Sequence, residues 1–372
     1  MTEVLISGAS VAGTATAYWL GRHGYSVTVV ERYRGPRPGG QAIDVRGPAL
    51  TVLERMGLLA AAQKRQTQIR GASVVDRDGN EVSQDTESTP TGGLIDSPDI
   101  ELLRDDLVEL LYGASQWTAE YMFDDAITGL DDNGETVSVT FERAAPRSFD
   151  LVIGADGLHS NVRRLVFGPE EQFIERLGTH AAIFTVPNFL NLDYWQSWHY
   201  GDSTMAGVYS ARNNTEARAM VGFMDSELRI DYRDTEAQFA ELERRMAGDG
   251  WIRPQLLEYM RAATDFYFDE MSQIKMDRWS QGRVGLVGDA GYCCSPLSGQ
   301  GTSVALLGAY VLVGELAAAG GDYTAGFANY HREFNDYVKR NQWLVVDNIP
   351  GGAPIPQEVF ERIVSSITLK DY

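Results

Sequence analysis

The sequence predicts an α/β protein in which a domain built on a parallel sheet carries an inserted antiparallel sheet. Two observations predict the parallel part: the chain opens with a strand, a glycine turn and a helix (VLISGASVAG), and near its other end a buried strand again enters a glycine-rich turn (GRVGLVGDAGYCCSPLSGQG, 282–301). A third observation is the alternation of aromatic and polar residues between about 172 and 275, which is typical of antiparallel strands.

The first elements form a parallel strand–helix–strand unit. We expect a strand at 3–7, a helix that follows Gly13 and ends near Gly24, and a second strand at 26–32.

The next segments alternate between helix and hairpin signals. The Gly-, Pro- and Arg-rich stretch 35–47 is expected to be a loop, and 48–65 a helix. Alternating apolar residues around Asp78-Gly79 predict an antiparallel hairpin over 70–85, and a leucine stripe predicts an amphipathic helix over 99–113.

The centre and the end of the chain follow the same rules. Short strands are expected over 117–142, and the apolar run FDLVIGADG predicts a strand that ends at Gly157, before a helix that begins near Ser160. Further helices are expected at 234–247, 253–262, 301–319, 324–342 and 356–367, the last one after a Pro/Gly break at 350–356.

The parallel and antiparallel textures divide the chain into interleaved pieces. We interpret 1–67, 99–169 and 276–342 as one cofactor-binding domain, 68–98 and 170–275 as an inserted domain, and 343–372 as a C-terminal helical region.

Length and charge limit the class of protein. A chain of 372 residues is long enough for about two domains, and 44% hydrophobic and 23% charged residues are usual for a globular protein. The net charge of −20 should repel nucleic acid and anionic membranes, so neither is expected as a partner. The N-terminus enters a strand without a basic, apolar leader, and we expect no apolar run to span a membrane, which favours the cytoplasm.

The cysteines and histidines predict neither a disulfide framework nor a metal site. Cys293 and Cys294 are adjacent and cannot cross-link distant parts of the fold. A vicinal redox pair and two small buried residues are both compatible with this spacing, and the second is the commoner case. The five histidines form no H-E-x-x-H or similar cluster.

The first motif is GASVAG, residues 8–13. Gly8 permits the tight turn and Gly13 permits close packing of helix on strand, whereas Ser10 replaces the second glycine of G-x-G-x-x-G. The amides of Ser10, Val11 and Ala12 at a helix start can receive a pyrophosphate.

Two charged residues follow at the end of the second strand. Glu31 stands about 20 residues after the turn, where a carboxylate binds ribose hydroxyls, and Arg32 is expected near the adenine. An ordinary tight turn and a solvated arginine are the alternatives to a dinucleotide site.

The second and third motifs carry one acidic residue each. Asp156 ends the strand in DLVIGADGLHSNVRR, where a plain turn residue would serve as well, and Arg163 and Arg164 could be surface charges. Gly288-Asp289 follow the strand VGLVG, where a carboxylate can bind a polyol hydroxyl such as the ribityl chain of a flavin.

The loop after Asp289 suits a flat ring. Pro296 fixes the loop, Gly299 and Gly301 allow close approach of the backbone, and the helix that starts near Gly301 directs its positive end at the ligand. Two such turns at opposite ends of the chain indicate one long cofactor, a flavin rather than a nicotinamide.

In this order, the three motifs resemble those of the class A flavoprotein monooxygenases, which have the para-hydroxybenzoate hydroxylase fold. The resemblance covers nearly the whole chain and implies a Rossmann-like FAD-binding domain with an inserted antiparallel β-sheet substrate domain and C-terminal helices. It also implies that Asp156 belongs to the cofactor site, together with Gln300, Thr302 and Ser303.

Two further similarities narrow the family. GGQAIDVRG (39–47) resembles a segment of tetracycline-inactivating monooxygenases and of hydroxylases that act on antibiotic-like polyketides. ELLRDDLVELL (101–111) resembles the helix whose arginine contacts FAD, which carries that role to Arg104. By the same resemblance Asp44 and Arg46 would lie near the flavin and the incoming nicotinamide.

The chain departs from the family pattern at a few positions. Tyr292 stands where the family has a histidine, Ser303 where it has an asparagine, and Gly308-Ala309 where it has Asp-Ala. No second dinucleotide unit follows, so the nicotinamide is expected to bind only transiently.

The resemblance implies an NAD(P)H-dependent FAD monooxygenase that uses NADH or NADPH and transfers oxygen from a C4a-hydroperoxyflavin to a small aromatic or polyketide-like substrate. No side chain is predicted to be an obligate catalytic acid or base, and a monomer is expected. The alternatives are an FAD oxidase or reductase that transfers no oxygen, and a protein that binds flavin or a drug without turnover.

Aromatic residues of the inserted sheet are candidates for the wall of the substrate cavity, with plain core packing as the alternative. They are Phe184, Trp198, Tyr200, Tyr209 and Phe223. His199, beside Trp198 and Tyr200, is a further candidate for the cavity wall.

Overall fold

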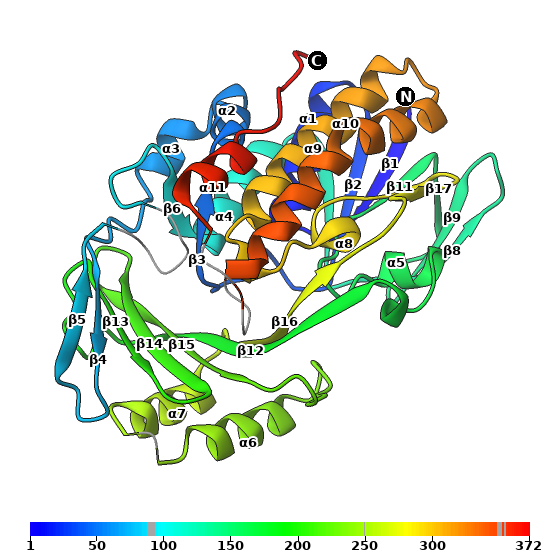
Figure 1. The fold of residues 1–372 in the computed structure, drawn as a ribbon. Helices are drawn as coiled ribbons and strands as arrows, with labels where there is room; N and C mark the ends of the chain where they lie inside the picture. The colour runs from blue at the N-terminus through cyan, green and yellow to red at the C-terminus, as the bar shows by residue number, and fades with distance from the viewer. Residues whose placement is uncertain (88–93, 249, 348–351, 353–354) are drawn as a thin grey trace.

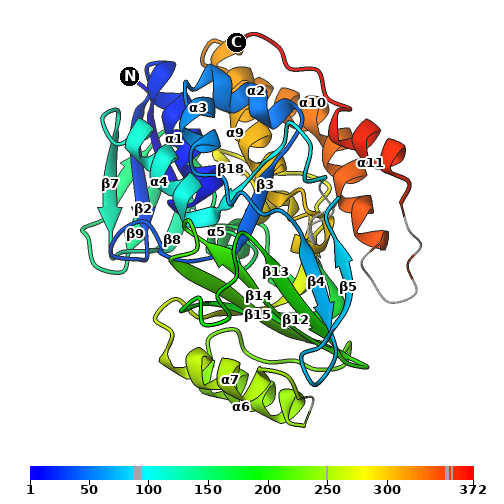
Figure 2. The ribbon, with the colours of Figure 1, turned by 90° about the vertical axis from the view of Figure 1, so that its left-hand side faces the viewer.

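The structure is a computed structural model that describes residues 1–87, 94–248, 250–347, 352 and 355–372. Two large sheets organise it: a parallel sheet under a layer of long helices, and an antiparallel sheet whose outer face carries a helix pair (Figures 1 and 2). We call the two parts the parallel-sheet domain and the antiparallel-sheet domain.

The parallel sheet has the strand order β17-β18-β11-β1-β2-β7, and only β17 is antiparallel to its neighbour. Helix α1 packs between α4 and α9, and α10 packs against α9. The carboxyl ends of the parallel strands meet at one edge, where ligands bind in open sheets of this kind. The elements are β1 (Glu3–Ser7), α1 (Val11–Arg22), β2 (Ser26–Glu31), α4 (Arg104–Ser115), β7 (Ala119–Phe123), β11 (Leu151–Gly154), β17 (Ser280–Gln281), β18 (Val284–Leu286), α9 (Gly301–Ala318) and α10 (Tyr323–Trp343).

The antiparallel-sheet domain has the strand order β16-β12-β15-β14-β13-β4-β5, in which only the pair β13–β4 is parallel. Its strands come from two separate stretches of the chain, on either side of the segment that contains α4. They are β4 (Ala72–Val75), β5 (Glu81–Asp85), β12 (Ile174–Val186), β13 (Gln196–Tyr200), β14 (Thr204–Ala211), β15 (Glu216–Met224) and β16 (Tyr267–Ile274), and the helices are α6 (Thr235–Met246) and α7 (Arg253–Ala262).

Smaller elements complete the fold. A three-stranded sheet lies beside the parallel sheet, and short helices flank the motifs. They are β8 (Ile127–Asp132), β9 (Val137–Phe141), β10 (Arg147–Phe149), α5 (Asn161–Val166), η1 (Glu170–Gln172), α8 (Asp289–Tyr292), η2 (Pro296–Ser298), η3 (Leu344–Asp347) and α11 (Gln357–Val364). Most of the break predicted at 350–356 lies outside the described residues.

A two-stranded sheet that the sequence reading missed joins the two domains. β3 (Ala42–Val45) lies in the predicted loop 35–47, and β6 (Ile100–Leu103) replaces the first turn of the predicted helix 99–113. The prediction for 99–113 was wrong because its first residues alternate between two faces, as in a strand. Ile100 and Leu102 enter the parallel-sheet core, while Glu101 points the other way.

The predicted helix 48–65 is also wrong in one respect. It is two helices, α2 (Pro48–Arg55) and α3 (Leu59–Gln63). Gly57 has φ +73°, a left-handed conformation that ends α2.

Helix α9 is apolar enough to span a membrane by length and composition alone. However, 78% of its residues are buried, and it packs against α1, α2 and α10, which identifies it as the core helix of this fold.

The aromatic core beneath α9 explains two departures from the family pattern together. Tyr292 is buried, and its hydroxyl accepts a hydrogen bond of 2.7 Å from Tyr330. A Cβ at Gly308 would overlap the Tyr292 hydroxyl. The tyrosine therefore occupies the space that a side chain at position 308 would need.

Replacing Gly308 with alanine should lower the free energy of unfolding by about 2 kcal/mol through overpacking, although alanine is the better helix former. In a Tyr292→Phe background, where the hydroxyl is gone, the same substitution should cost less, as urea unfolding of the four proteins can measure. Gly113→Ala in α4 is the matched control, because a Cβ there meets open space, and it should be neutral or stabilising. An equal cost of Gly308→Ala in both backgrounds would contradict this packing argument.

Candidate cofactor site

The first motif forms a sharp turn that leaves no room for side chains. Gly8 has φ +103°, and a Cβ there would lie 2.5 Å from the carbonyl oxygen of Ala155. Ser10 is the N-cap of α1 and makes no capping bond with its own hydroxyl, and Val11, Ala12 and Gly13 begin the helix. The first amides of α1 are thus presented as an anion site beside the strand ends.

Glu31 braces this turn. Its carboxylate accepts hydrogen bonds from the amides of Ala9 (2.7 Å) and Tyr33 (3.0 Å), at the end of β2, and Arg32 next to it is exposed. A ribose bound here would meet a carboxylate whose position is already fixed.

The Asp156 side chain stabilises the turn between β11 and α5. Its carboxylate accepts bonds from the Ser160 hydroxyl (2.5 Å) and from the amides of Asn161 (2.9 Å) and Val162 (3.0 Å), which caps α5. Burial raises its pKa. A Cβ at Gly8 would lie 3.1 Å from the Cα of Asp156, so the first and second motifs are in contact.

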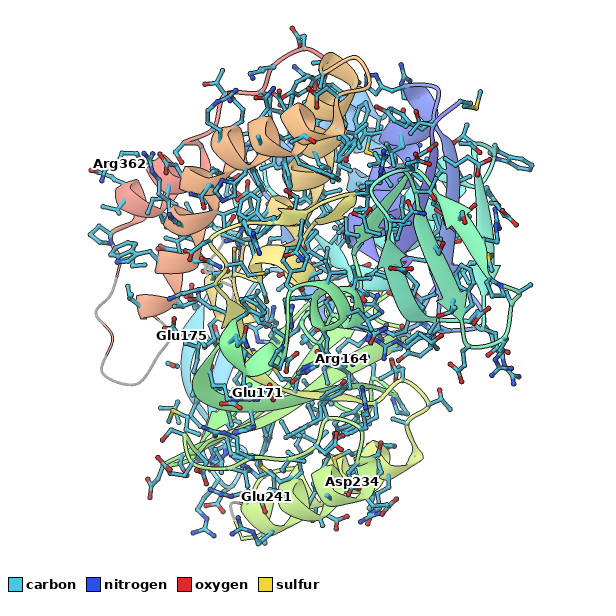
Figure 3. All side chains as sticks on the ribbon, turned by 90° about the vertical axis from the view of Figure 1, so that its right-hand side faces the viewer. Arg164, Glu171, Glu175, Asp234, Glu241 and Arg362 are labelled. Carbon is cyan, nitrogen blue, oxygen red and sulfur yellow. The ribbon has the colours of Figure 1, made fainter. Side chains whose placement is uncertain are left out.

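The two arginines that follow differ in environment. Arg164 is exposed on α5 (Figure 3), but Arg163 is completely buried, so of the two possible surface charges only Arg164 is one. Arg163 donates to the carbonyls of Ala290 (2.9 Å) and Leu158 (2.6 Å) and pairs with Glu170. It therefore fixes the turn next to Asp289.

The third motif lies against the first. A Cβ at Gly288 would lie 2.8 Å from the Cβ of Ala12. The neighbouring Asp289 side chain is accessible to solvent although protein surrounds it on most sides, and this burial raises its pKa. An accessible carboxylate beside the start of α1 is suited to a hydroxyl ligand.

The loop before α9 keeps the geometry expected for a flat ligand. Pro296 is exposed, Gly299 has φ +63°, and a Cβ at Gly301 would meet nothing within 4 Å. Gln300 is fully buried, and neither polar atom of its side-chain amide has a hydrogen-bond partner among the described residues. Since a buried amide without partners is costly, this side chain fits a site that a ligand completes.

Thr302 and Ser303 belong to the first turn of α9. Thr302 is partly exposed, whereas the Ser303 hydroxyl is buried, accepts a bond from the amide of Arg46 (2.9 Å) and donates to the carbonyl of Asp44 (3.3 Å). Ser303 thus ties β3 to the start of α9.

Arg104 gives the strongest indication of a bound group. It is 7% exposed, and its Nη2 donates to the carbonyls of Pro38 (3.4 Å), Gly39 (2.6 Å) and Arg37 (3.0 Å). Its Nε and Nη1 are buried and lack hydrogen-bond partners among the described residues. Burial lowers the pKa of this guanidinium to about 10, so it is still charged at neutral pH.

Asp44 and Arg46 form a buried ion pair of 3.0 Å at the end of β3. A cavity of about 120 Å³ opens beside them and is also lined by Glu101, Thr67 and Asp99. Burial and the nearby Asp44 carboxylate raise the pKa of Glu101. The sequence reading missed Glu101 because it placed this residue in a helix.

The inserted sheet directs the proposed wall residues to opposite faces. Trp198 and Tyr209 pack with Ala42 and Leu103 of the β3–β6 sheet, and Tyr200 stacks on Trp198 and is 55% exposed. Tyr209 also accepts a bond from the Ala42 amide (2.9 Å).

The remaining wall candidates need correction. Phe184 and Phe223 lie in the apolar core under α6 and α7, on the face turned away from the parallel-sheet domain. They therefore cannot line a cavity between the domains. The prediction was wrong because side chains alternate between the two faces of a sheet, and the sequence does not show which face each position takes. His199 is on the same outer side, 2.9 Å from Arg253 of α7.

Sequence reasoning also missed Tyr267 of β16. It is 38% exposed, its hydroxyl donates to Asp269 (2.8 Å), and the Arg37 guanidinium lies 5.2 Å from its ring centre. Burial raises its pKa well above the usual value, and the adjacent Asp269 carboxylate adds to this. The strand pattern alone did not distinguish it from the other sheet aromatics.

The contacts among the three motifs, together with Glu31, Arg104 and the loop before α9, fit a dinucleotide that extends along the parallel sheet. Among the described residues, no group of three or more His, Cys, Asp or Glu is placed to hold a metal ion. These features are those of a flavoprotein. Among the described residues, Arg104 and Gln300 have buried polar atoms without hydrogen-bond partners, and the glycines of the motifs allow a ligand to approach the backbone; both observations fit FAD.

The comparisons with known proteins give the family. The family model described as an FAD binding domain matches residues 1–341. A flavin-dependent monooxygenase of Legionella longbeachae is 38% identical over 340 residues, which cover 91% of this chain and 87% of that protein. An uncharacterized protein of Mycobacterium tuberculosis is 82% identical over the full length of both chains.

A solved structure supports the same family. The crystal structure of the tetracycline destructase Tet(51) superposes with a TM-score of 0.90 at 33% identity and covers all of both chains. The chain belongs to the FAD-binding family of flavin-dependent monooxygenases, and it is an FAD-dependent monooxygenase.

Proposed function

We propose that this protein uses NADH or NADPH and dioxygen to hydroxylate a small aromatic or polyketide-like molecule of the antibiotic type. The proposal for the substrate class is based on the inner face of the antiparallel sheet, which is apolar and turned toward the parallel-sheet domain. This face is formed by Trp198, Tyr200, Met205 and Met220. Such a surface suits a flat substrate. The tetracycline destructases among the similar structures support the same class.

Bound FAD would supply the redox chemistry, namely acceptance of a hydride and activation of dioxygen. The residues of this chain bind and orient. The first turn of α1 would receive the pyrophosphate, Glu31 a ribose, and Asp289 the ribityl chain. The amides at the start of α9 would stabilise negative charge on the ring, and the inner sheet face would exclude water.

Oxygen transfer is the decisive test. Purified holoprotein should oxidise NAD(P)H faster when tetracycline or another flat polyketide is present, and mass spectrometry should find one atom from labelled dioxygen in the product. Reductant consumption that never labels a product would favour an oxidase without oxygen transfer. A protein that takes up no FAD would contradict both activities. A demand for NAD(P)H also agrees with the cytoplasmic location that we expect.

Replacing Asp289 with alanine should weaken FAD retention about tenfold, because a charge-assisted hydrogen bond to a ribityl hydroxyl is lost. Equilibrium dialysis with FAD measures this. Asp277→Ala, an exposed carboxylate in the loop before β17, is the control and should retain FAD like the wild type. Unchanged FAD binding by Asp289→Ala would show that the ribityl contact is misplaced.

A further inference from the structure

A short segment that we call the strap, residues 37–42, passes between the two domains beside Arg104. On the parallel-sheet side, Arg104 holds it through the carbonyls of Arg37, Pro38 and Gly39, and the Arg104 amide donates to the Gln41 carbonyl (3.0 Å). Asp105 accepts a bond of 3.0 Å from the Gly39 amide. The strap and the orientation of Arg104 are therefore one structural unit.

The antiparallel-sheet domain holds the same strap from the other side. Arg218 of β15 donates to the Gly40 carbonyl (3.2 Å), and the Tyr209 hydroxyl accepts from the Ala42 amide (2.9 Å). Gly39 has φ +71°, and a Cβ there would collide with Asp265, which is itself fixed by two bonds to Thr185. The strap is therefore held by hydrogen bonds from both domains and packs closely against Asp265 at Gly39.

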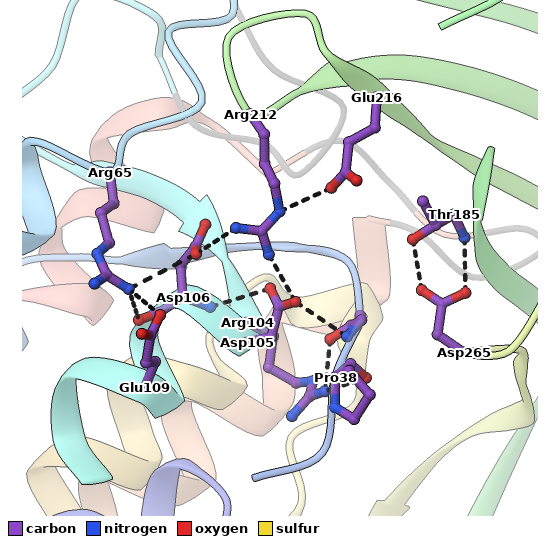
Figure 4. Close-up of polar contacts among 12 residues, drawn as sticks. Pro38, Arg65, Arg104, Asp105, Asp106, Glu109, Thr185, Arg212, Glu216 and Asp265 are labelled. Carbon is purple, nitrogen blue, oxygen red and sulfur yellow. Dashed lines mark hydrogen bonds and ion pairs between the residues drawn. The ribbon is translucent and has the colours of Figure 1, made fainter. Parts of the chain in front are cut away.

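One arginine links these two sets of contacts. Arg212, in the turn between β14 and β15, donates to Asp105 (2.8 Å), Asp106 (2.7 Å) and Glu216 (2.8 Å) (Figure 4). Glu216 also accepts from Arg218 (2.8 Å). A continuous ionic chain thus runs from the Gly40 carbonyl through Arg218, Glu216 and Arg212 to Asp105 and the Gly39 amide.

The charge balance makes Arg212 important for this chain. Asp105 and Asp106 are adjacent in sequence, and their side chains are only 15% and 12% exposed. Arg65 also approaches Asp106 (3.8 Å), but Arg212 is the cation paired with Asp105 among the described residues. Without Arg212, two largely buried like charges would repel each other, and Asp105 would gain by turning toward water and releasing Gly39.

We propose that Arg212 is a positioning residue for FAD: from the antiparallel-sheet domain it fixes Asp105, and through Asp105 it fixes the strap and the guanidinium of Arg104 that faces the cofactor. The inference rests on the FAD site and not on the identity of the reductant or substrate, so its failure would leave the proposed function untouched. It means that cofactor retention depends on how the two domains dock.

The test is FAD affinity, measured by equilibrium dialysis of the full chain after removal of FAD. Arg212→Met should weaken FAD binding about tenfold, the effect of one lost charge-assisted contact. Arg212→Lys should recover part of the affinity, because it keeps the charge but not the three-way fork. In an Asp105→Asn background, Arg212→Met should add little, since both substitutions release the same strap.

A matched arginine separates this role from general stabilisation. Arg261 lies in the same domain, has similar exposure (44% against 38%) and pairs with Glu243 and Glu236, which both belong to that domain. Arg261→Met should leave FAD affinity unchanged. The proposal is overturned if Arg212→Met binds FAD within twofold of the wild type, or if it loses no more affinity than Arg261→Met. If Arg212→Met does not fold, the comparison of Arg212→Lys with Arg261→Lys decides in the same way.

Discussion

Replacing Arg104 with methionine should reduce FAD affinity about a hundredfold, the largest effect on binding that we expect from one side chain. Two losses combine in this variant. The buried Nε and Nη1, which have no hydrogen-bond partners among the described residues, would no longer reach the cofactor, and the three strap carbonyls held by Nη2 would be released. Each charged hydrogen bond contributes about 1.5–3 kcal/mol, so two losses at the lower end of this range, about 3 kcal/mol together, give roughly a hundredfold. Equilibrium dialysis with FAD measures it directly.

Arg65 provides the control for Arg104. It lies beside α4, pairs with Glu109 and approaches Asp106, and its side chain is 33% exposed. Arg65→Met should keep FAD affinity near that of the wild type. If Arg104→Met retained FAD equally well, the unpaired nitrogens would have to be satisfied by water alone, and the cofactor would have to bind elsewhere.

The sequence could predict those parts of the candidate cofactor site in which the backbone conformation or close packing at one position requires glycine. Gly8 and Gly299 have positive φ, and Gly13 and Gly288 lie against other backbone or side chains. These requirements act over a few residues, so a turn motif records them directly. The family resemblance, the α/β fold and the FAD-dependent monooxygenase activity are confirmed by the comparisons.

The sequence could not predict what depends on strand register and on contacts between distant segments. Phe184 and Trp198 look alike as sheet aromatics, yet one lies under α6 and α7 and the other faces the parallel-sheet domain. Glu101 was placed in a helix because the leucine periodicity of α4 extended over it, and only its pairing with Asp44 across β3–β6 reveals its environment. The individual contacts of the predicted FAD-binding residues stay predictions until the variants are measured.

The departure at Tyr292 shows a third limit. Read alone, Tyr292 and Gly308 were two separate differences from the family pattern. In the fold, the tyrosine hydroxyl fills the space above Gly308 and bonds Tyr330, so one packing solution explains both. A pattern read along the chain cannot show this, because it does not contain the distance between positions 292 and 308.

His159 should make stability depend on pH in a predictable direction. It follows the Asp156-Gly157 turn and stands between Glu170 (3.0 Å) and Asp269 of β16 (3.1 Å), with Tyr232 stacked on its ring at 3.8 Å. Burial by itself would lower its pKa, but the hydrogen bonds to the two carboxylates outweigh burial and raise the pKa from 6.5 to about 9. Arg163, which also pairs with Glu170, is the nearest other cation among these contacts.

The sign follows from linkage. Because the pKa is higher in the folded state, the charged imidazolium stabilises the fold fully below pH 6.5, and this stabilisation disappears as the pH rises through 9. The shift corresponds to about 3 kcal/mol. His159→Gln should therefore be less stable than the wild type by about that amount at pH 6, and the gap should close by pH 10, as urea unfolding across the pH range would measure.

A second histidine tests whether the effect belongs to this site. Burial and Arg22 lower the pKa of His23, so His23→Gln should lose no stability at low pH and can only gain there. A gap for His159→Gln that stays constant from pH 6 to pH 10 would mean that packing against Tyr232, and not charge, is what the histidine supplies. A gap that closes identifies the ion pairs of His159 with Glu170 and Asp269 as its source. The pair with Asp269 joins the two domains, so acidic conditions would strengthen this link and alkaline conditions would release it.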